Sequence, residues 1–196
     1  MGEAIFNSPL SRHALSDSTY ISLREIADRG MIDLRGNASD KKFMAAVKKV
    51  LGAELPKLPR TSVSWGEYKS LWLSIDQWLI LVPRAKADAL HAELTQALVG
   101  IHSLAVNVSD MRSVIRLEGA RAREVLMKGT STDLMDSNLG PGFVRRLRFA
   151  EIAALLHVIE VDVIDLHVFR SYADYAFAFL TKASRKGSEV RMFPDV

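Results

Sequence analysis

The sequence contains no cysteine among its 196 residues. Without thiols, the chain cannot form a disulfide framework, a cysteine nucleophile or a thiolate-ligated metal or iron-sulfur site. We therefore expect a protein of a reducing cytoplasm. The longest apolar stretches are interrupted by charges or prolines and are too short to cross a bilayer, so we expect no membrane contact. Residues 1–18 also lack the basic and apolar regions of an export signal.

An excess of charge is missing as well. The sequence has 26 basic and 23 acidic residues, which gives a net charge of +3. So small an excess does not require a polyanion, and we expect no nucleic acid partner. The content of 48% hydrophobic and 25% charged residues is that of an ordinary globular protein. A chain of this length can bury roughly 70% of its unfolded surface.

No phosphate-binding loop, dinucleotide fingerprint or HExxH motif is present. Two groups of residues are nevertheless candidates for a metal site and for a hydrolytic site. His157 and His167 lie on neighbouring expected strands and could bind a metal with Asp162 or Asp165, although both could equally face solvent or accept a backbone partner. His102, Ser109 and Asp110 have the residue types of a hydrolytic triad, but alternation along one strand sends their side chains to opposite faces. We expect no catalytic residue, bound cofactor or metal in this chain.

Residues 1–20 are polar, contain Pro9 and lack periodicity, which predicts an extended arm. The runs "YISLREI" and "MIDLRG" then predict a strand pair that turns at Arg29-Gly30. Ser39 is expected to cap a helix that reaches Leu51. Period-two alternation over residues 63–82 indicates strands, and a second helix follows over residues 84–98.

The second half repeats this mixture of strands and helices. Residues 103–110 and 113–119 predict strands, and "GARAREVLMKG" predicts a short helix with Glu124 and Lys128 paired outward. Three strands follow the "GPG" segment. In the last helix we expect Tyr172, Tyr175 and Phe179 inward, Phe177 outward, and a capping box at Ser171 and Asp174.

These elements form two blocks, residues 21–110 and 111–196, which together make one compact unit. The pattern predicts an α+β fold of two ferredoxin-like β-sheet halves with helices on one face. There is no strong internal repeat, only a faint echo between "LILVPRAKADAL" and "IRLEGARAREVL".

Two groups of large or charged side chains are possible contact sites for a partner protein. Trp72 falls opposite Leu71 and Leu73 on its strand, so it either faces a partner or lies under the helix of residues 84–98. Arg145, Arg146 and Arg148 lack interleaved aromatics, which favours a solvated or partner-facing edge over a phosphate-binding site.

Several segments are distinctive in their order and spacing: "SPL", "ISLREIADRGMIDLRG", "WLSIDQWLILVP", "VSDMRSVIRLEGARAREVLMKG", "GPG" and "RSYADYAFAFL". In this order and spacing they resemble the gamma subunit family of heterotetrameric sarcosine oxidase. Ala120 replaces a proline, Thr130 a cysteine and "TDLMD" a Leu-Asp-Leu-His-Pro run that is usual in the family, which argues for a divergent branch.

The resemblance implies a fold like the folate-binding domain of aminomethyltransferases. It also implies an accessory subunit of an oxidase that demethylates sarcosine to glycine, with hydrogen peroxide and formaldehyde or methylene-tetrahydrofolate as products. FAD, FMN, NAD and tetrahydrofolate are expected on other subunits, and the large alpha subunit is the expected main partner. We expect contacts at Pro9, Leu10, Trp72 and Phe177. The alternative is a stand-alone folate-binding one-carbon protein, and an RNA-binding repair protein is a third possibility.

Overall fold

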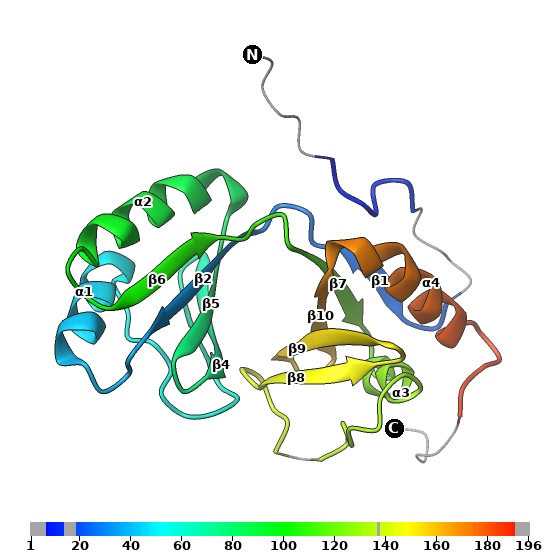
Figure 1. The fold of residues 1–196 in the computed structure, drawn as a ribbon. Coiled ribbons are helices and arrows are strands. Elements are labelled where there is room, and N and C mark those ends of the chain that lie inside the picture. The colour runs from blue at the N-terminus through cyan, green and yellow to red at the C-terminus, as the bar shows by residue number, and fades with distance from the viewer. Residues whose placement is uncertain (1–6, 14–18, 137, 191–196) are drawn as a thin grey trace. The chain divides into compact units, whose positions relative to one another are not determined.

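The computed structural model of the protein describes residues 7–13, 19–136 and 138–190 (Figure 1). The chain divides into two compact units, unit 1 (residues 1–27, 112–141 and 146–196) and unit 2 (residues 28–111 and 142–145). The strands are β1 (Ser22–Glu25), β2 (Gly30–Gly36), β3 (Ser62–Trp65), β4 (Tyr68–Ser74), β5 (Gln77–Val82), β6 (Ser103–Asn107), β7 (Arg112–Glu118), β8 (Val144–Phe149), β9 (Ile152–Glu160) and β10 (Val163–Phe169). The helices are α1 (Lys41–Leu51), α2 (Ala87–Ala97), α3 (Ala122–Met127) and α4 (Ala173–Ala183), with 3₁₀ turns η1 (Arg84–Lys86) and η2 (Arg170–Tyr172).

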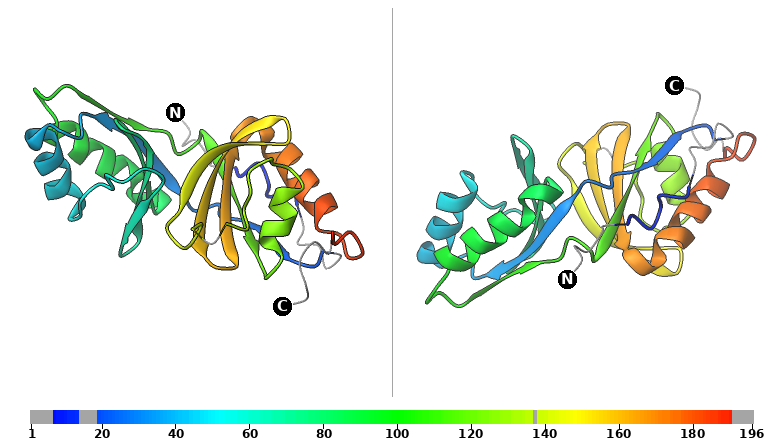
Figure 2. Two further views of the ribbon diagram at one scale, coloured as in Figure 1. Left: turned by 90° about the horizontal axis from the view of Figure 1, so that it is seen from below. Right: turned by 90° about the horizontal axis from the view of Figure 1, so that it is seen from above.

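Unit 2 contains a five-stranded sheet in the order β3-β4-β5-β2-β6. Helices α1 and α2 cover one face of it (Figure 2). Strand alternation places Ile32, Leu34, Trp78 and Ile80 on this face, where they pack against Phe43 and other buried side chains of the two helices. The apolar stripe of each helix thus determines which face of the sheet it covers.

Helix α1 has defined signals at both ends. The Asp40 carboxylate accepts a hydrogen bond from the Lys42 N–H at 2.8 Å, so Asp40 is the N-cap, one residue later than predicted. Gly52 ends the helix at φ 73°, and its N–H donates to the Lys48 carbonyl at 2.8 Å.

Unit 1 contains the second five-stranded sheet, in the order β1-β7-β10-β9-β8. Helix α4 packs against β10 and α3 (Figure 1). The two sheets with helices confirm the predicted α+β class. Glu124 is buried rather than outward, and it accepts hydrogen bonds from Tyr20 and from the Val190 N–H.

The predicted orientation of the last helix is wrong for Tyr172, Tyr175 and Phe177. Phe179 is inward as predicted, because it is partly buried and its ring centroid lies 5.1 Å from that of Phe149 on β8, edge to face. Ala173, Ala176, Phe177 and Leu180 are buried, whereas Tyr172 and Tyr175 are exposed. The predicted stripe and the buried stripe both include Ala176 and Leu180. The buried stripe also includes Ala173, and its small alanines let the helix approach the sheet closely. The predicted capping box is also wrong, because the N-cap is Tyr172 and no side chain caps this end.

The strand pair predicted for residues 20–36 is wrong too. Strand β1 pairs with β7 in unit 1, with Leu23 opposite Leu117, whereas β2 pairs with β5 and β6 in unit 2. The alternating pattern identifies each strand but not its neighbour. Residues 21–27 therefore belong to unit 1, which contains most of the second half of the chain.

The two units repeat one arrangement. Strands β3, β4, β5 and β2 occupy the places that β8, β9, β10 and β7 occupy in the other sheet. In each unit a strand runs through a three-residue 3₁₀ turn into an 11-residue helix, as β5-η1-α2 and as β10-η2-α4. The fifth strand is β6 in unit 2 and β1 in unit 1. The echo predicted from sequence had paired the wrong helices.

Candidate functional site

A group of largely buried titratable side chains lies on the sheet of unit 1. Arg116 on β7, Asp165 on β10 and His157 on β9 stand in one cross-strand row, because Asp165 pairs with both neighbours in register. His167 lies two residues along β10 and therefore on the same face. Asp165, His157 and His167 are buried. We call these four residues the β10 cluster.

An ion pair dominates the β10 cluster. Arg116 Nε donates to Asp165 Oδ1 at 2.6 Å, and its Nη2 donates to Oδ2 at 2.9 Å. Burial is the largest single influence and would by itself raise the pKa of the Asp165 carboxyl. The hydrogen bonds from Arg116, together with the electrostatic interactions with Arg116 and the two histidines, outweigh burial, so the pKa is lowered. The bond to Asp165 raises the pKa of Arg116 in turn. Both groups are therefore charged at neutral pH.

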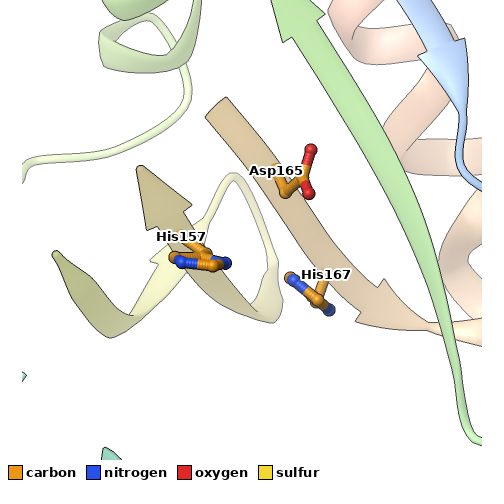
Figure 3. Close-up of side chains that lie close together, drawn as sticks. All are labelled: His157, Asp165 and His167. Carbon is orange, nitrogen blue, oxygen red and sulfur yellow. The ribbon is translucent and has the colours of Figure 1, made fainter. Parts of the chain in front are cut away.

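The structure brings together both histidines of the metal site considered from sequence, with Asp165 rather than Asp162 beside them. One ligand atom each from His157, Asp165 and His167 lies within 4.8 Å of the others. Figure 3 shows the Asp165 carboxylate on the side of β10 that faces β7, away from His157. Both of its oxygens bind a guanidinium, which already supplies the positive charge that a cation would bring. This geometry favours a structural ion pair over a metal centre. Asp162 lies in the β9–β10 turn, where its carbonyl accepts from Gly119.

Arg116 was not predicted as a site residue, although the sequence contains a signal for it. Arg116 is a charged residue inside the otherwise apolar run "SVIRLEG", between the fully buried Ile115 and Leu117. A charge at the centre of a buried strand requires a partner, because an unpaired one is costly. Asp165, inside the apolar run of β10, is the matching signal.

The residues of the considered triad have other partners. Ser109 Oγ donates to Asn107 Oδ1 at 2.6 Å and accepts from the Met31 N–H at 3.0 Å. Asp110 binds Arg84 at 2.6 Å. His102 instead lines a surface pocket of about 400 Å³ in unit 2, together with Arg35, Ile75 and Leu104 among others.

Residues 7–13 lie against unit 1. His13 Nε2 is 2.8 Å from an Asp174 carboxylate oxygen, and its ring centroid is 4.8 Å from that of Phe177. Leu10 is buried, and Ser8 donates to the Glu25 carboxylate. Residues 1–6 and 14–18 of the predicted arm lie outside the described residues.

These contacts bear on the four expected contact residues. Phe177 has only 6% of its surface exposed, so the expectation that it is free on the outer side of its helix is wrong. The ring of His13 packs against it at a tilt of 43°, and the neighbouring Leu10 is buried as well. Pro9 is partly exposed, and its contact with a partner stays a prediction.

Trp72 lies on the helix side of its sheet. It pairs with Trp78 across β4 and β5, and it packs, partly buried, against the core that α1 and α2 share. This is the second of the two interpretations that the sequence left open. A partner contact at Trp72 stays a prediction, and only the exposed part of the side chain could make it.

The described residues include no helix that is both long and apolar enough to cross a membrane.

Comparisons with known proteins agree on a family. Residues 35–186 match the model of the sarcosine oxidase gamma subunit family. The chain is 31% identical over 144 residues to the sarcosine oxidase subunit gamma of Corynebacterium sp. (strain P-1), covering 72% of this chain and 68% of that protein.

Two solved structures support the fold. A chain of heterotetrameric sarcosine oxidase from Corynebacterium sp. U-96, in complex with pyrrole 2-carboxylate, superposes with a TM-score of 0.84 at 23% identity, over 96% of this chain and 99% of that one. The glycine cleavage system aminomethyltransferase T from Bartonella henselae gives a TM-score of 0.60 at 16% identity, over 81% and 45%. This confirms the expected likeness to aminomethyltransferases. The chain belongs to the sarcosine oxidase gamma subunit family.

Proposed function

We propose that this chain is a non-catalytic gamma subunit of a heterotetrameric sarcosine oxidase and stabilises the complex by packing on the large subunit. The observation that carries the proposal is the family match over residues 35–186. The fold supports it, because a chain of a heterotetrameric sarcosine oxidase superposes on this one along nearly the whole length of both. The reaction served is the oxidative demethylation of sarcosine to glycine.

The chemistry of the described residues supports an accessory role. Asp165 is held by Arg116, Ser109 by Asn107 and the backbone of Met31, and Asp174 by His13. These groups stabilise the fold and present no nucleophile paired with a general base. FAD, FMN, NAD and tetrahydrofolate belong to the other subunits in this proposal. A cytoplasmic location is consistent with the absence of cysteine.

Co-expression tests the assignment. The tagged chain is produced together with the other oxidase subunits, and the mixture is separated by size-exclusion chromatography. We expect the chain to elute with the complex at constant stoichiometry. Elution of the folded chain at its own monomer volume, beside an intact complex of the others, would contradict the proposal.

Calorimetry addresses the alternative of a stand-alone folate-binding protein. The likeness to the aminomethyltransferase concerns the fold alone, and a shared fold does not imply a shared ligand. We expect no heat of binding when tetrahydrofolate is titrated into the isolated chain. Binding with a micromolar dissociation constant would favour the alternative.

A further inference from the structure

The fifth strands of the two sheets, β1 and β6, occupy equivalent edges but differ in their surfaces. β1 reads Ser-Leu-Arg-Glu, and its Arg24 binds Glu118 on β7 at 3.0 Å. β6 reads Ser-Leu-Ala-Val-Asn and carries no charge. Native proteins protect edge strands with charges, prolines or a covering segment, because a bare edge recruits another strand. β6 has neither a charge nor a proline.

On one side, the backbone of β6 pairs with no other strand. The Val108 N–H donates to the Met31 carbonyl at 2.8 Å, which fixes the alternation of the β2–β6 ladder. Leu104 and Val106 therefore direct their backbone groups toward β2. Ser103, Ala105 and Asn107 direct theirs away from the sheet. The Ala105 carbonyl lies 3.1 Å from His91 Nε2 of α2. The outward N–H groups of β6 are therefore the groups that an incoming strand could bind.

The side chains beside this edge are apolar and exposed. Leu104 and Val106 lie on the same face of β6, with 49% and 38% of their surface exposed. Ile75, in the β4–β5 turn, is 79% exposed and lines the pocket of about 400 Å³ together with Leu104. Ile75 and Leu104 at the pocket, with Val106 beside Leu104 on the same face of β6, form a recognisable contact surface.

One cation lies at the end of this apolar surface. Arg35 pairs with Leu104 across the β2–β6 ladder, so it shares the face of Leu104 and also lines the pocket. Its side chain is half exposed, and the nearest acid, Asp33, is 3.9 Å away. A carboxylate on an incoming chain would therefore find a positive charge that is only weakly paired.

We propose that β6, with Arg35 and Ile75, docks an extended segment of another oxidase subunit, which adds a sixth strand to the sheet of unit 2. The segment carries an apolar side chain that fills the pocket and an acidic side chain opposite Arg35. The outward N–H groups of β6 bind its backbone carbonyls, as in other cases of strand addition. We call this surface the β6 edge. The inference rests on the proposed function, because that function supplies the partner.

The test is a co-purification with charged variants. Leu104→Asp combined with Val106→Asp places two carboxylates on the β6 edge. Val161→Asp, at an exposed valine of the β9–β10 turn, is the control. We expect the double variant to lower the affinity for the other subunits by roughly tenfold or more, because desolvated apolar contacts dominate interface energies. The control should bind like the wild type. Circular dichroism verifies that each variant is folded.

Hydrogen exchange separates strand addition from contact through side chains alone. In the isolated wild-type chain, the amides of Ser103 and Asn107 should exchange quickly, and they should become protected in the complex. Unchanged exchange together with normal assembly of the double variant would overturn the proposal, while leaving the subunit assignment intact. Failure of the wild type itself to assemble would refute the assignment.

A second copy of this chain is the competing occupant. If the isolated wild-type chain dimerises and the double variant is monomeric, the β6 edge pairs with itself and the proposed occupant is wrong. Sedimentation of the isolated chain distinguishes these outcomes, since the proposal expects a monomer.

Discussion

Unit 1 and unit 2 have the same strand order, but they stabilise their sheets differently. The centre of the unit 1 sheet carries a buried ion pair and two buried histidines, whereas the unit 2 sheet is centred on apolar side chains such as Ile32, Ile80 and Trp78. The fifth strands differ in the opposite sense, because β1 is charged and β6 is apolar. The same strand order thus accommodates a paired charge at the centre of the unit 1 sheet. In unit 2 it presents the apolar strand β6 at the edge, where we propose that a partner binds.

All three tryptophans lie in unit 2, at positions 65, 72 and 78. Tryptophan fluorescence therefore reports on unit 2, whereas far-ultraviolet circular dichroism reports on both units. This contrast allows each substitution to be assigned to the unit that it weakens.

The largest expected effect comes from Arg116→Met. It leaves the Asp165 carboxylate buried without its guanidinium, which should lower the free energy of unfolding by about 3–5 kcal/mol. In a urea titration, part of the dichroism signal should therefore be lost at a lower urea concentration than the fluorescence change, which reports on unit 2 alone. A loss below about 1 kcal/mol, the range of exposed pairs, would mean that the ion pair is not essential to unit 1. Glu118→Gln, at the half-exposed pair with Arg24, is the control.

Acid should weaken unit 1 through the same carboxylate. The pKa of Asp165 is lowered in the folded state, so its contribution is present above the unfolded value of about 3.9 and is lost as the pH falls through the lower folded value. The stability gap between wild type and an Asp165→Asn variant should therefore narrow below about pH 4. Urea titrations at several pH values measure it, and a constant gap down to pH 2 would contradict the assignment.

Gly36→Ala should affect unit 2 instead. An added Cβ would lie 2.4 Å from the Phe43 ring, so the substitution should cost about 1–3 kcal/mol and move the fluorescence transition. Gly129→Ala is its counterpart in unit 1, where the added Cβ would lie 2.4 Å from the Phe149 ring. Gly140→Ala, with open space around the Cβ, is the matched control. Equal stability of Gly36→Ala and this control would show that the close approach is unimportant.

The smallest effect is expected for His13→Ala. It removes a ring contact with Phe177 and the pair with Asp174, which together should contribute about 0.5–1.5 kcal/mol. Faster hydrogen exchange in α4, with unchanged exchange in α2, would show that residues 7–13 protect unit 1 only. Unaltered exchange in α4 would mean that the segment does not cover it.

The sequence predicted most elements but few of their neighbours. Helix α1 follows from its apolar stripe and from the glycine after it, both local signals. The pairing of β1 with β7 joins residues almost a hundred positions apart, and no local pattern encodes it. The chain passes between unit 1 and unit 2 in five segments, and each segment can be assigned to its unit only when the whole sheet order is known.

The candidate site shows the same limit. The histidines of β9 and β10 and the carboxylate of Asp165 were identified from their strands, but Arg116 was not, because it lies on a strand more than forty residues away in the sequence. In α4, the aromatic side chains outside the buried stripe concealed the role of its alanines. The exposure of β6 likewise depends on its place at the end of the sheet.

The central claim is that the chain contributes structure and not chemistry, and sarcosine-dependent hydrogen peroxide formation tests it most directly. The assay compares the isolated chain, the other subunits alone, and the reconstituted complex before and after heating. We predict no turnover by the isolated chain and a longer half-life at elevated temperature for the complex that contains it. Turnover of sarcosine by the isolated chain, or equal half-lives with and without it, would contradict the account.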